Sequence, residues 1–244
     1  MNKELNIVIP LAGRGSRFDQ FKLPKPLIDV DGKSVIWYAV SSLGFKGNYI
    51  YITRKYDDHS LNINLNNLLN ELTPNCKIIE IDYVTDGPAS SVLLAKEYIN
   101  NDIPLFVTNC DRVTHWNSED FLTFVENNDS DGVVITWDNI APTESFIELD
   151  ENGCGVRLVE KEIISEHPLN GMHYWEKGKY FIESTEKMID KNIRINNEFY
   201  ISMTYNQMIE DDYKIKVYKM NENEHFSLGS PGDINKYKSW KNLK

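Results

Sequence analysis

The chain has 244 residues and a hydrophobic content of 41%, which is enough to bury a substantial core without disulfide bridges. Its formal net charge of −11 at pH 7 argues against a general nucleic-acid binder, because such a protein needs a basic face. Three widely spaced cysteines and the lack of a signal peptide or an apolar run of membrane-spanning length favour a cytoplasmic protein without a zinc site or membrane insertion.

Strands and helices alternate through the first half of the chain. Apolar runs predict strands over Leu5–Leu11, Tyr49–Thr53, Lys77–Ile81, Ile103–Thr108 and Gly132–Trp137. Apolar residues at helix spacing and capping residues predict helices over Ser34–Leu43, His59–Leu72, Ser90–Ile99 and Ser118–Glu126. This order predicts an α/β fold in which helices cover both faces of a mixed, mainly parallel sheet.

Shorter segments follow in the second half. A turn over Asp150–Gly153 predicts a hairpin between strands Ser145–Leu149 and Gly155–Val159. Further strands are expected at Asn170–Trp175 and Lys214–Lys219, and further helices at Lys179–Ile189, Ile201–Glu210 and Asp233–Trp240. The sequence contains no linker, repeat or low-complexity segment, so we expect one domain over residues 1–244.

A glycine-rich turn and a lysine between two prolines follow the first predicted strand. The turn reads LAGRGSR over Leu11–Arg17, and LPKPL covers Leu23–Leu27. Backbone N–H groups in such a turn form an anion site, and Arg17 and Lys25 add positive charge beside it. The alternative is an ordinary turn between a strand and a helix. The Walker motif and the full dinucleotide fingerprint are both absent, so the pattern favours another kind of polyphosphate site.

Together, these two motifs resemble the N-terminal motif of the nucleotidyltransferases that activate phosphorylated sugars and alcohols. The resemblance implies a Rossmann-like, glycosyltransferase-A-like fold, with a nucleotide-binding half over residues 1–138 and an acceptor-binding half over residues 139–244. It also implies that Arg17 and Lys25 are catalytic and lie against the phosphates of a nucleoside triphosphate. The turn residues that would wrap this nucleotide are Leu11, Ala12, Gly13, Arg14, Gly15 and Ser16.

Asp111 follows the buried strand that ends at Thr108. Ligands of open α/β sheets bind beyond the carboxyl ends of the strands, so this carboxylate is expected near the glycine turn. A divalent cation would relieve its repulsion from a triphosphate, and Mg²⁺ prefers one or two carboxylates plus phosphate oxygens. We therefore expect Asp111 to bind Mg²⁺, although the residue could instead cap the next segment. The resemblance also implies this magnesium ligand.

Small residues open the helix that follows the third predicted strand. N–H groups at a helix start can reach the edge of a flat base when the side chains are small. Such a stretch contacts the nucleobase in the resembled family, which implies nucleotide binding by Asp86, Gly87, Ala89 and Ser90. Pro88 departs from the common Gly-Thr-Ala pattern, so the identity of the base stays open. A well-packed helix start is the alternative.

The acceptor residues are carried over from the same family. Glu160 and Lys161 match its Glu-Lys pair, although strand alternation points their side chains to opposite faces. Asn170 and Gly171 resemble its Asn-x-Gly stretch, and Glu198 is expected on the same wall, with Tyr200 beside it. Near the C-terminus, Ser227 stands where the family often has a second metal-binding aspartate, which leaves that second ligand open.

The sequence therefore predicts a nucleotidylyltransferase that joins a nucleoside triphosphate to a phosphorylated small molecule and releases pyrophosphate. The runs Asp86–Ala95 and Pro104–Asp111 resemble capsule-associated members, which favours CTP and a cytidylyltransferase acting on phosphorylated L-glutamine for capsular phosphoramidate. A sugar-1-phosphate nucleotidylyltransferase for surface polysaccharide is the chief alternative. A glycosyltransferase or a silent nucleotide-binding module also remains open, as does assembly into a homo-oligomer.

Overall fold

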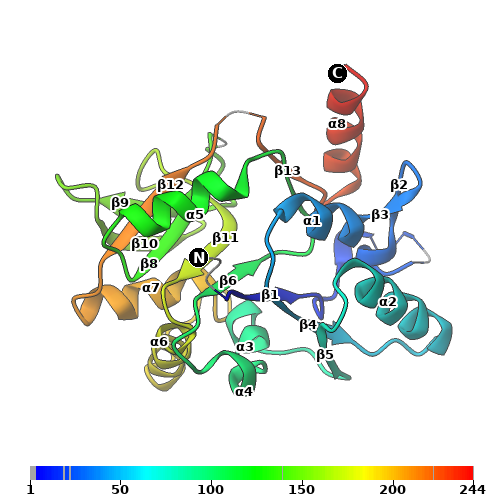
Figure 1. Cartoon of the computed structure of the whole chain (residues 1–244), viewed down its shortest axis with the longest axis horizontal. Coiled ribbons are helices and arrows are strands. Elements are labelled where there is room, and N and C mark those ends of the chain that lie inside the picture. The colour runs from blue at the N-terminus through cyan, green and yellow to red at the C-terminus, as the bar shows by residue number, and fades with distance from the viewer. Residues whose placement is uncertain (1–3, 19, 22, 139, 222, 244) are drawn as a thin grey trace.

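A mixed sheet of seven strands forms the centre of the molecule in the computed structural model, which describes residues 4–18, 20–21, 23–138, 140–221 and 223–243 (Figure 1). The predicted boundary between the two halves adjoins residue 139, outside these ranges. The strand order is β12-β8-β11-β6-β1-β4-β5. In chain order the strands are β1 (Asn6–Pro10), β4 (Asn48–Arg54), β5 (Lys77–Ile81), β6 (Leu105–Thr108), β8 (Gly132–Thr136), β11 (Leu169–Trp175) and β12 (Ile215–Lys219).

All neighbouring strands of this sheet pair in parallel except for β11, which runs antiparallel to both β6 and β8. Strand β1 lies between β4 and β6, and the chain moves to β4 and β5 on one side before it returns to β6 on the other. The order of the strands therefore reverses beside β1. In open α/β sheets a ligand crevice forms at such a reversal, beyond the carboxyl ends of the strands.

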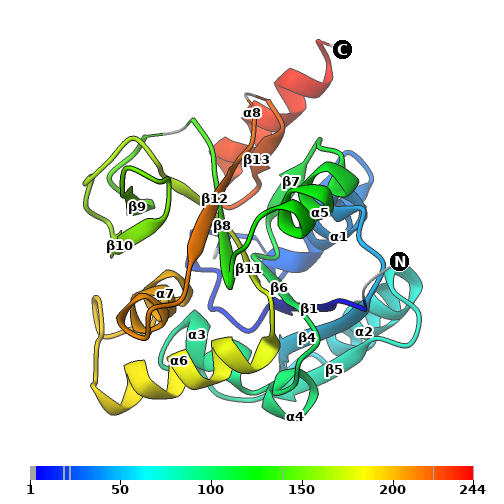
Figure 2. The same ribbon diagram turned by 60° about the vertical axis from the view of Figure 1, so that its left-hand side comes forward.

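Helices cover both faces of the sheet (Figure 2). One face packs against α3 (Pro88–Leu93), α4 (Lys96–Ile99), α6 (Gly178–Asp190) and α7 (Ile201–Glu210). The other packs against α1 (Val35–Leu43), α2 (His59–Leu72) and α5 (Ser118–Asn127). Side chains alternate along β1, so Val8 joins the first core while Ile7 and Ile9 join the second. Burial on both faces explains why β1 is a continuous apolar run in the sequence.

Smaller elements surround the sheet. Three two-stranded pairs are formed by β2 (Asp29–Val30) with β3 (Lys33–Ser34), β7 (Arg112–Thr114) with β13 (His225–Ser227), and β9 (Ser145–Leu149) with β10 (Gly155–Glu160). Two short 3-10 helices are η1 (Ser16–Phe18) and η2 (Lys25–Leu27). The last helix, α8 (Pro231–Lys241), extends away from the body in Figure 1. A third apolar cluster, which includes Phe18 and Val113, joins the base of α8 to the region of the glycine turn.

The structure confirms the α/β class, the mainly parallel sheet and the helices on both faces. The predicted helix Ser90–Ile99 is instead divided into α3 and α4, because the chain tightens into turns at Leu94 and Ala95. The pairs β2–β3 and β7–β13 were not predicted. Across the described ranges, each helix is too short or too polar to cross a lipid bilayer.

Candidate nucleotide-binding site

A cleft of about 640 Å³ opens at the carboxyl ends of β1 and β6. The glycine turn and the Pro-Lys-Pro segment form one part of its wall, and Tyr56 to Asp58, after β4, contribute to another. Asn109 to Arg112, which follow β6, complete the wall together with Gly229. The cleft thus lies where the reversal of strand order predicts a ligand crevice.

The glycine turn is a compact loop against the lysine segment. Gly15 has a φ of +66°, in the region that favours glycine, and its carbonyl accepts a hydrogen bond from Phe18 N–H at 2.8 Å. A Cβ atom at Gly15 would lie 3.3 Å from Cβ of Lys25, so the two motifs are in contact. Leu11 and Ala12 are buried at the foot of the turn, whereas Gly13, Arg14, Ser16 and Arg17 are exposed.

Lys25 begins the short 3-10 helix η2. Pro24 precedes it with a φ of −60°, and Pro24 O accepts a hydrogen bond from Leu27 N–H at 2.9 Å. Because each proline fixes its own φ, the two prolines beside Lys25 restrict the backbone that presents the amine. The Lys25 Nζ atom lies 2.5 Å from Oδ2 of Asp111, 86 positions away in the chain. The two predicted phosphate-site motifs therefore meet in space.

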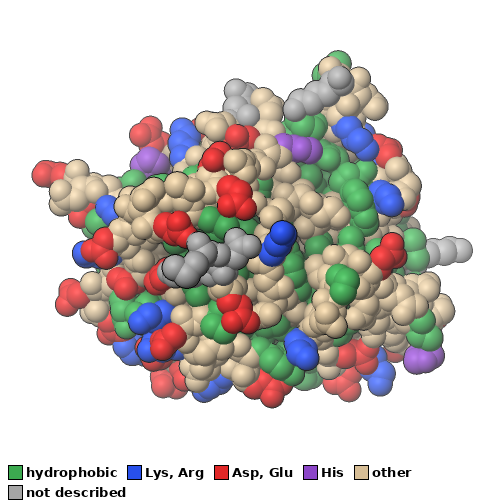
Figure 3. Space-filling view, in the orientation of Figure 1, with side chains coloured by type: hydrophobic (Ala, Val, Ile, Leu, Met, Phe, Trp, Pro, Cys, Tyr) green, Lys and Arg blue, Asp and Glu red, His purple; other side chains and the backbone are tan. Residues whose placement is uncertain are grey.

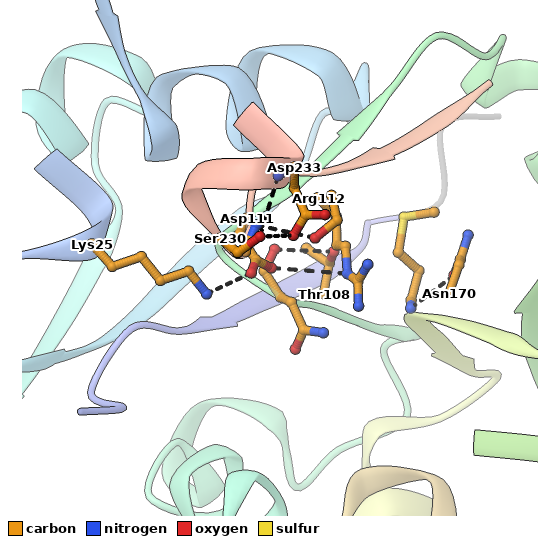
Figure 4. Close-up of polar contacts among 11 residues, drawn as sticks. Lys25, Thr108, Asp111, Arg112, Asn170, Ser230 and Asp233 are labelled. Carbon is orange, nitrogen blue, oxygen red and sulfur yellow. Dashed lines mark hydrogen bonds and ion pairs between the residues drawn. The ribbon is translucent and has the colours of Figure 1, made fainter. Parts of the chain in front are cut away.

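Asp111 is buried and is surrounded by positive charge. Its Oδ1 lies 3.8 Å from Arg112 Nε, on the side away from Lys25 (Figure 4). Burial alone would raise the pKa of the Asp111 carboxyl, but Lys25 and Arg112 hold that pKa well below its usual range. Burial alone would lower the pKa of Lys25, but the negative charge of the Asp111 carboxylate and the hydrogen bond to it raise that pKa. Both groups therefore stay charged near neutral pH.

The segment before α8 closes over Asp111. Leu228 N–H donates to Asp111 O at 2.7 Å, and Gly229 N–H donates to Ser227 Oγ at 3.0 Å. A Cβ atom at Gly229 would lie 2.8 Å from Oδ2 of Asp111 and 3.0 Å from Ser227 Oγ. A side chain at this position would press on the Asp111 carboxylate, and both that carboxylate and the Ser227 hydroxyl border the space that Gly229 leaves open. Ser230 Oγ then accepts from Asp233 N–H and caps α8.

The donor set suits a magnesium ion that is shared with substrate phosphates. Asp111 provides one carboxylate, and the nearby Ser227 is a neutral hydroxyl. Among the residues with described positions, no group of three or more His, Cys, Asp and Glu side chains could hold a metal ion. Mg²⁺ binds proteins through as few as one carboxylate when phosphate oxygens and water complete its octahedron. Asp111 fits such a site with one protein carboxylate. The described residues do not provide enough ligands for a site made of protein groups alone.

The predicted base-binding segment lies apart from this cleft and contacts the predicted acceptor wall. Phe199 N–H donates to Asp86 O at 2.7 Å, and Ala89 N–H donates to Phe199 O at 3.0 Å. Gly87 has a φ of +124°, and a Cβ atom there would meet the backbone of Phe199 at 2.5 Å. Arg194 reaches the Asp86 carboxylate at 3.0 Å and lies over the Phe199 ring. Ala89 is fully buried and Ser90 is half-buried.

Three residues on the predicted acceptor wall form a hydrogen-bonded chain. Lys161 Nζ donates to Tyr200 Oη at 2.6 Å, and Tyr200 Oη donates to Glu198 Oε2 at 2.7 Å. Glu160 instead turns inward and accepts from Ser145 and Ser202, and burial raises the pKa of its carboxyl. Glu160 and Lys161 point in opposite directions as expected, but for another reason: β10 ends at Glu160, and Lys161 follows it with a φ of +59°, outside the strand.

Asn170 and Gly171 lie at the start of β11, between the cleft and this wall. Asn170 is 0% exposed; its amide contacts Met220 Sδ and accepts from Met172 N–H, so the side chain does not reach solvent. Gly171 has a φ of +83°, and a Cβ atom there would lie 2.4 Å from Asn109 Nδ2. In this conformation Asn170 supports the strand, while Gly171 provides space beside the cleft. Their predicted role in acceptor binding stays a prediction.

Sequence reasoning missed Arg112, Arg194 and the cleft wall at Tyr56 to Asp58. Arg112 directly follows Asp111, so the same strand-end rule could have identified it. Arg194 donates a hydrogen bond to Asp86, 108 positions earlier in the chain, and no local sequence pattern indicates that pairing. On the face shown in Figure 3, acidic and basic side chains are interspersed, in keeping with a local anion site rather than a broad basic surface.

The family model for the MobA-like NTP transferase domain matches residues 7–174, which include the glycine turn, Lys25 and Asp111. The chain belongs to this family. It is therefore a nucleotidyltransferase by family. "Bifunctional protein GlmU" of Methanocaldococcus jannaschii is 27% identical over 157 residues, which are 60% of this chain and 36% of that protein. The chain thus spans about a third of the length of that relative.

Solved structures of two nucleotidyltransferases share the fold. The nucleoside-diphosphate-sugar pyrophosphorylase from Vibrio cholerae RC9 superposes with a TM-score of 0.80 at 20% identity, over 95% of this chain and 98% of that one. The inositol-1-phosphate CTP transferase from T. maritima superposes with a TM-score of 0.76 at 17% identity, over 99% of this chain and 95% of that one. At these identities the likeness concerns the fold of this family member and not its substrates.

Proposed function

We propose that this chain joins a nucleoside triphosphate, with CTP favoured, to a phosphorylated small molecule and releases pyrophosphate. One observation carries the proposal: Lys25 and Asp111 meet at 2.5 Å in a cleft whose wall is the glycine turn. This arrangement sets backbone N–H groups, a fixed cation and a charged carboxylate around one space. A triphosphate needs donors and cations, and a carboxylate fits beside it when a divalent cation lies between them.

The reaction requires positioning more than covalent work by the protein. An oxygen of the acceptor phosphate attacks the α-phosphorus in line and forms a new phosphorus–oxygen bond. The bond between the α-phosphorus and the oxygen shared with the β-phosphorus breaks, and pyrophosphate leaves with the electron pair. Lys25 and Arg17 would neutralise negative charge that gathers on the phosphate oxygens, and Lys161 would hold the acceptor phosphate.

Magnesium is part of the proposal. Asp111 would hold the ion together with phosphate oxygens, and the ion would supply charge neutralisation along the triphosphate. The base would contact the segment Asp86–Ser90, and the acceptor would lie against Lys161, Gly171 and Glu198. Direct contact between Gly87 and Phe199 supports this arrangement, because it links the two predicted binding segments.

The finer assignment is a cytidylyltransferase that acts on phosphorylated L-glutamine in the synthesis of capsular phosphoramidate. Resemblance of Asp86–Ala95 and Pro104–Asp111 to capsule-associated members supports it, and a structural neighbour is a CTP transferase. The second candidate is a sugar-1-phosphate nucleotidylyltransferase, which is favoured by the neighbour described as a nucleoside-diphosphate-sugar pyrophosphorylase.

A pyrophosphate-release assay over CTP, UTP, dTTP and GTP with a panel of phosphorylated acceptors tests the proposal. The panel includes phosphorylated L-glutamine, glucose 1-phosphate and inositol 1-phosphate, and mass spectrometry identifies each product. Turnover with CTP and phosphorylated L-glutamine alone supports the finer assignment. Turnover with a sugar 1-phosphate supports the second candidate. Folded protein that binds a triphosphate but releases no pyrophosphate with any pair refutes the proposed reaction.

A further inference from the structure

Arg112 is a largely buried cation whose Nε atom makes no hydrogen bond to any residue that the structure describes. Its side chain is 14% exposed, and that Nε atom is itself buried. Its contact with Asp111 Oδ1 spans 3.8 Å, which exceeds hydrogen-bond length. A guanidinium carries five N–H donors, and leaving such donors unpaired away from water is costly. The Nε–H group of Arg112 therefore has an unused donor that an acceptor on a ligand could satisfy.

The guanidinium lies on the acceptor side of Asp111. Figure 4 shows Lys25 approaching the carboxylate from one side and Arg112 lying on the other, towards Asn170. A Cβ atom at Gly171 would lie 3.5 Å from Arg112 Nε, so the absence of a side chain at Gly171 leaves space next to the guanidinium. Glu144, in the predicted acceptor-binding half, also lies near Arg112. Burial raises the pKa of the Glu144 carboxyl, and the charge of Arg112 partly offsets that rise.

Two cations in the cleft thus have different surroundings. Both flank the Asp111 carboxylate, but Lys25 does so beside the glycine turn, where the triphosphate is expected, whereas Arg112 does so next to Gly171. An ammonium acts as a compact point charge, but the planar fork of a guanidinium matches the two oxygens of a carboxylate or of a phosphate. The position and shape of Arg112 suit a second oxyanion that is separate from the triphosphate.

We infer that Arg112 recognises a carboxylate on the acceptor, so that the preferred acceptor is a phosphorylated small molecule with a second anionic group. This inference rests on the proposed function and narrows its substrate class. The 1-phosphates of neutral sugars, such as glucose 1-phosphate, have no anion besides their phosphate and would leave the Nε–H group of Arg112 without this partner. A site whose buried polar group stays unpaired discriminates strongly against such a substrate.

The test uses two probes that differ at one group. D-3-Phosphoglycerate carries a carboxylate where sn-glycerol 3-phosphate carries a hydroxymethyl group, and both are phosphomonoesters. Titration calorimetry of the intact protein measures the affinity for each probe without nucleotide. We expect the carboxylate probe to bind about tenfold to a hundredfold more tightly, as for hydrogen bonds to charged groups. Arg112→Gln should remove this preference, and Arg112→Lys should retain only part of it.

Arg157→Gln is the matched control, because Arg157 is exposed and pairs with Glu148 at 3.0 Å on β9–β10, outside the residues that line the cleft. It should keep the full preference. Circular dichroism and thermal melting confirm that each variant is folded, and Arg112→Lys retains the charge if Arg112→Gln does not fold.

Three outcomes would overturn the inference. The wild-type protein could bind both probes equally or neither of them, Arg112→Gln could weaken both equally, or Arg112→Gln could raise the KM for the triphosphate alone. Equal weakening would mean that Arg112 holds the attacking phosphate. Failure of the proposed function is distinct, because it appears as absent pyrophosphate release, whereas the calorimetric preference is measured without turnover.

Discussion

Replacement of Lys25 by methionine is expected to lower both catalysis and folding stability, for separate reasons. The Lys25 Nζ atom lies 2.5 Å from Asp111 Oδ2, and the two side chains are only 17% and 7% exposed. Removing one partner of a buried ion pair typically costs about 3–5 kcal/mol, because the other charge is left uncompensated. Arg112 still faces Asp111 Oδ1 at 3.8 Å and the cleft admits water, so we expect a loss of about 2 kcal/mol.

The catalytic loss should be larger than the stability loss suggests. Loss of one preorganised group that stabilises developing charge costs about 10²- to 10³-fold in kcat, and Lys25→Met removes such a group. Pyrophosphate release measures kcat, and urea unfolding followed by circular dichroism measures the free energy of unfolding. Lys214→Met is the matched control, since Lys214 pairs with Asp129 on the surface, where the side chains are 55% and 90% exposed. It should leave both kcat and the urea midpoint essentially unchanged, because an exposed ion pair contributes little to stability.

A double-mutant cycle with Asp111→Asn separates the two effects. Neutralising Asp111 in the Lys25→Met protein removes the uncompensated charge. The double variant should therefore lose less stability than the two single variants lose in total, and this difference, the coupling energy, should be about 1–3 kcal/mol. Activity should stay low in the double variant. Additive stability losses, or a folded Lys25→Met enzyme with wild-type kcat, would refute the reasoning.

Three further predictions follow from other parts of the structure. Gly15→Ala should raise the KM for the triphosphate about tenfold, because φ at this position is +66° and the new Cβ atom would meet Lys25. The control is Gly32→Ala, at a φ of +85° in open space, which should cost only about 1 kcal/mol of stability and leave that KM unchanged. Equal KM values for the two variants in steady-state assays would contradict this prediction. Chelation with EDTA should abolish pyrophosphate release without a change in melting temperature, and Mg²⁺ should restore it; turnover that persists in EDTA would exclude the metal. Asn206→Ala should lower the free energy of unfolding by about 2 kcal/mol in urea, since the amide exchanges two 2.8 Å hydrogen bonds with the Leu158 backbone; an unchanged urea midpoint would contradict this.

That the glycine turn and Asp111 lie close together could be predicted from the sequence, because their positions depend on the order of the strands in the backbone and not on side-chain packing. Val8 and Val107 occupy neighbouring parallel strands, so the turn after β1 and the carboxylate after β6 had to share one edge of the sheet. Once the alternation of strands and helices was recognised, proximity between Lys25 and Asp111 required no knowledge of side-chain packing.

Features that depend on packing between remote segments could not be predicted in this way. The burial of Asn170 depends on Met220, 50 positions away, and β7 forms only because the segment before α8 pairs with it. Strands of three residues carry no periodicity that could indicate them. The hairpin β2–β3 is different, because Asp31-Gly32 is a recognised turn signal that the sequence did offer.

The hydrogen bond from Leu228 to Asp111 has a consequence for dissecting this protein. The family match ends at Tyr174, yet the backbone carbonyl of Asp111 accepts its hydrogen bond from Leu228, which lies more than fifty residues beyond that end. Strand β12 and the Gly229 edge of the cleft come from the same later part of the chain. A fragment cut at the boundaries of the family match would keep the glycine turn and Asp111 but lose Leu228, which hydrogen-bonds the Asp111 backbone, and Gly229, which lines the cleft.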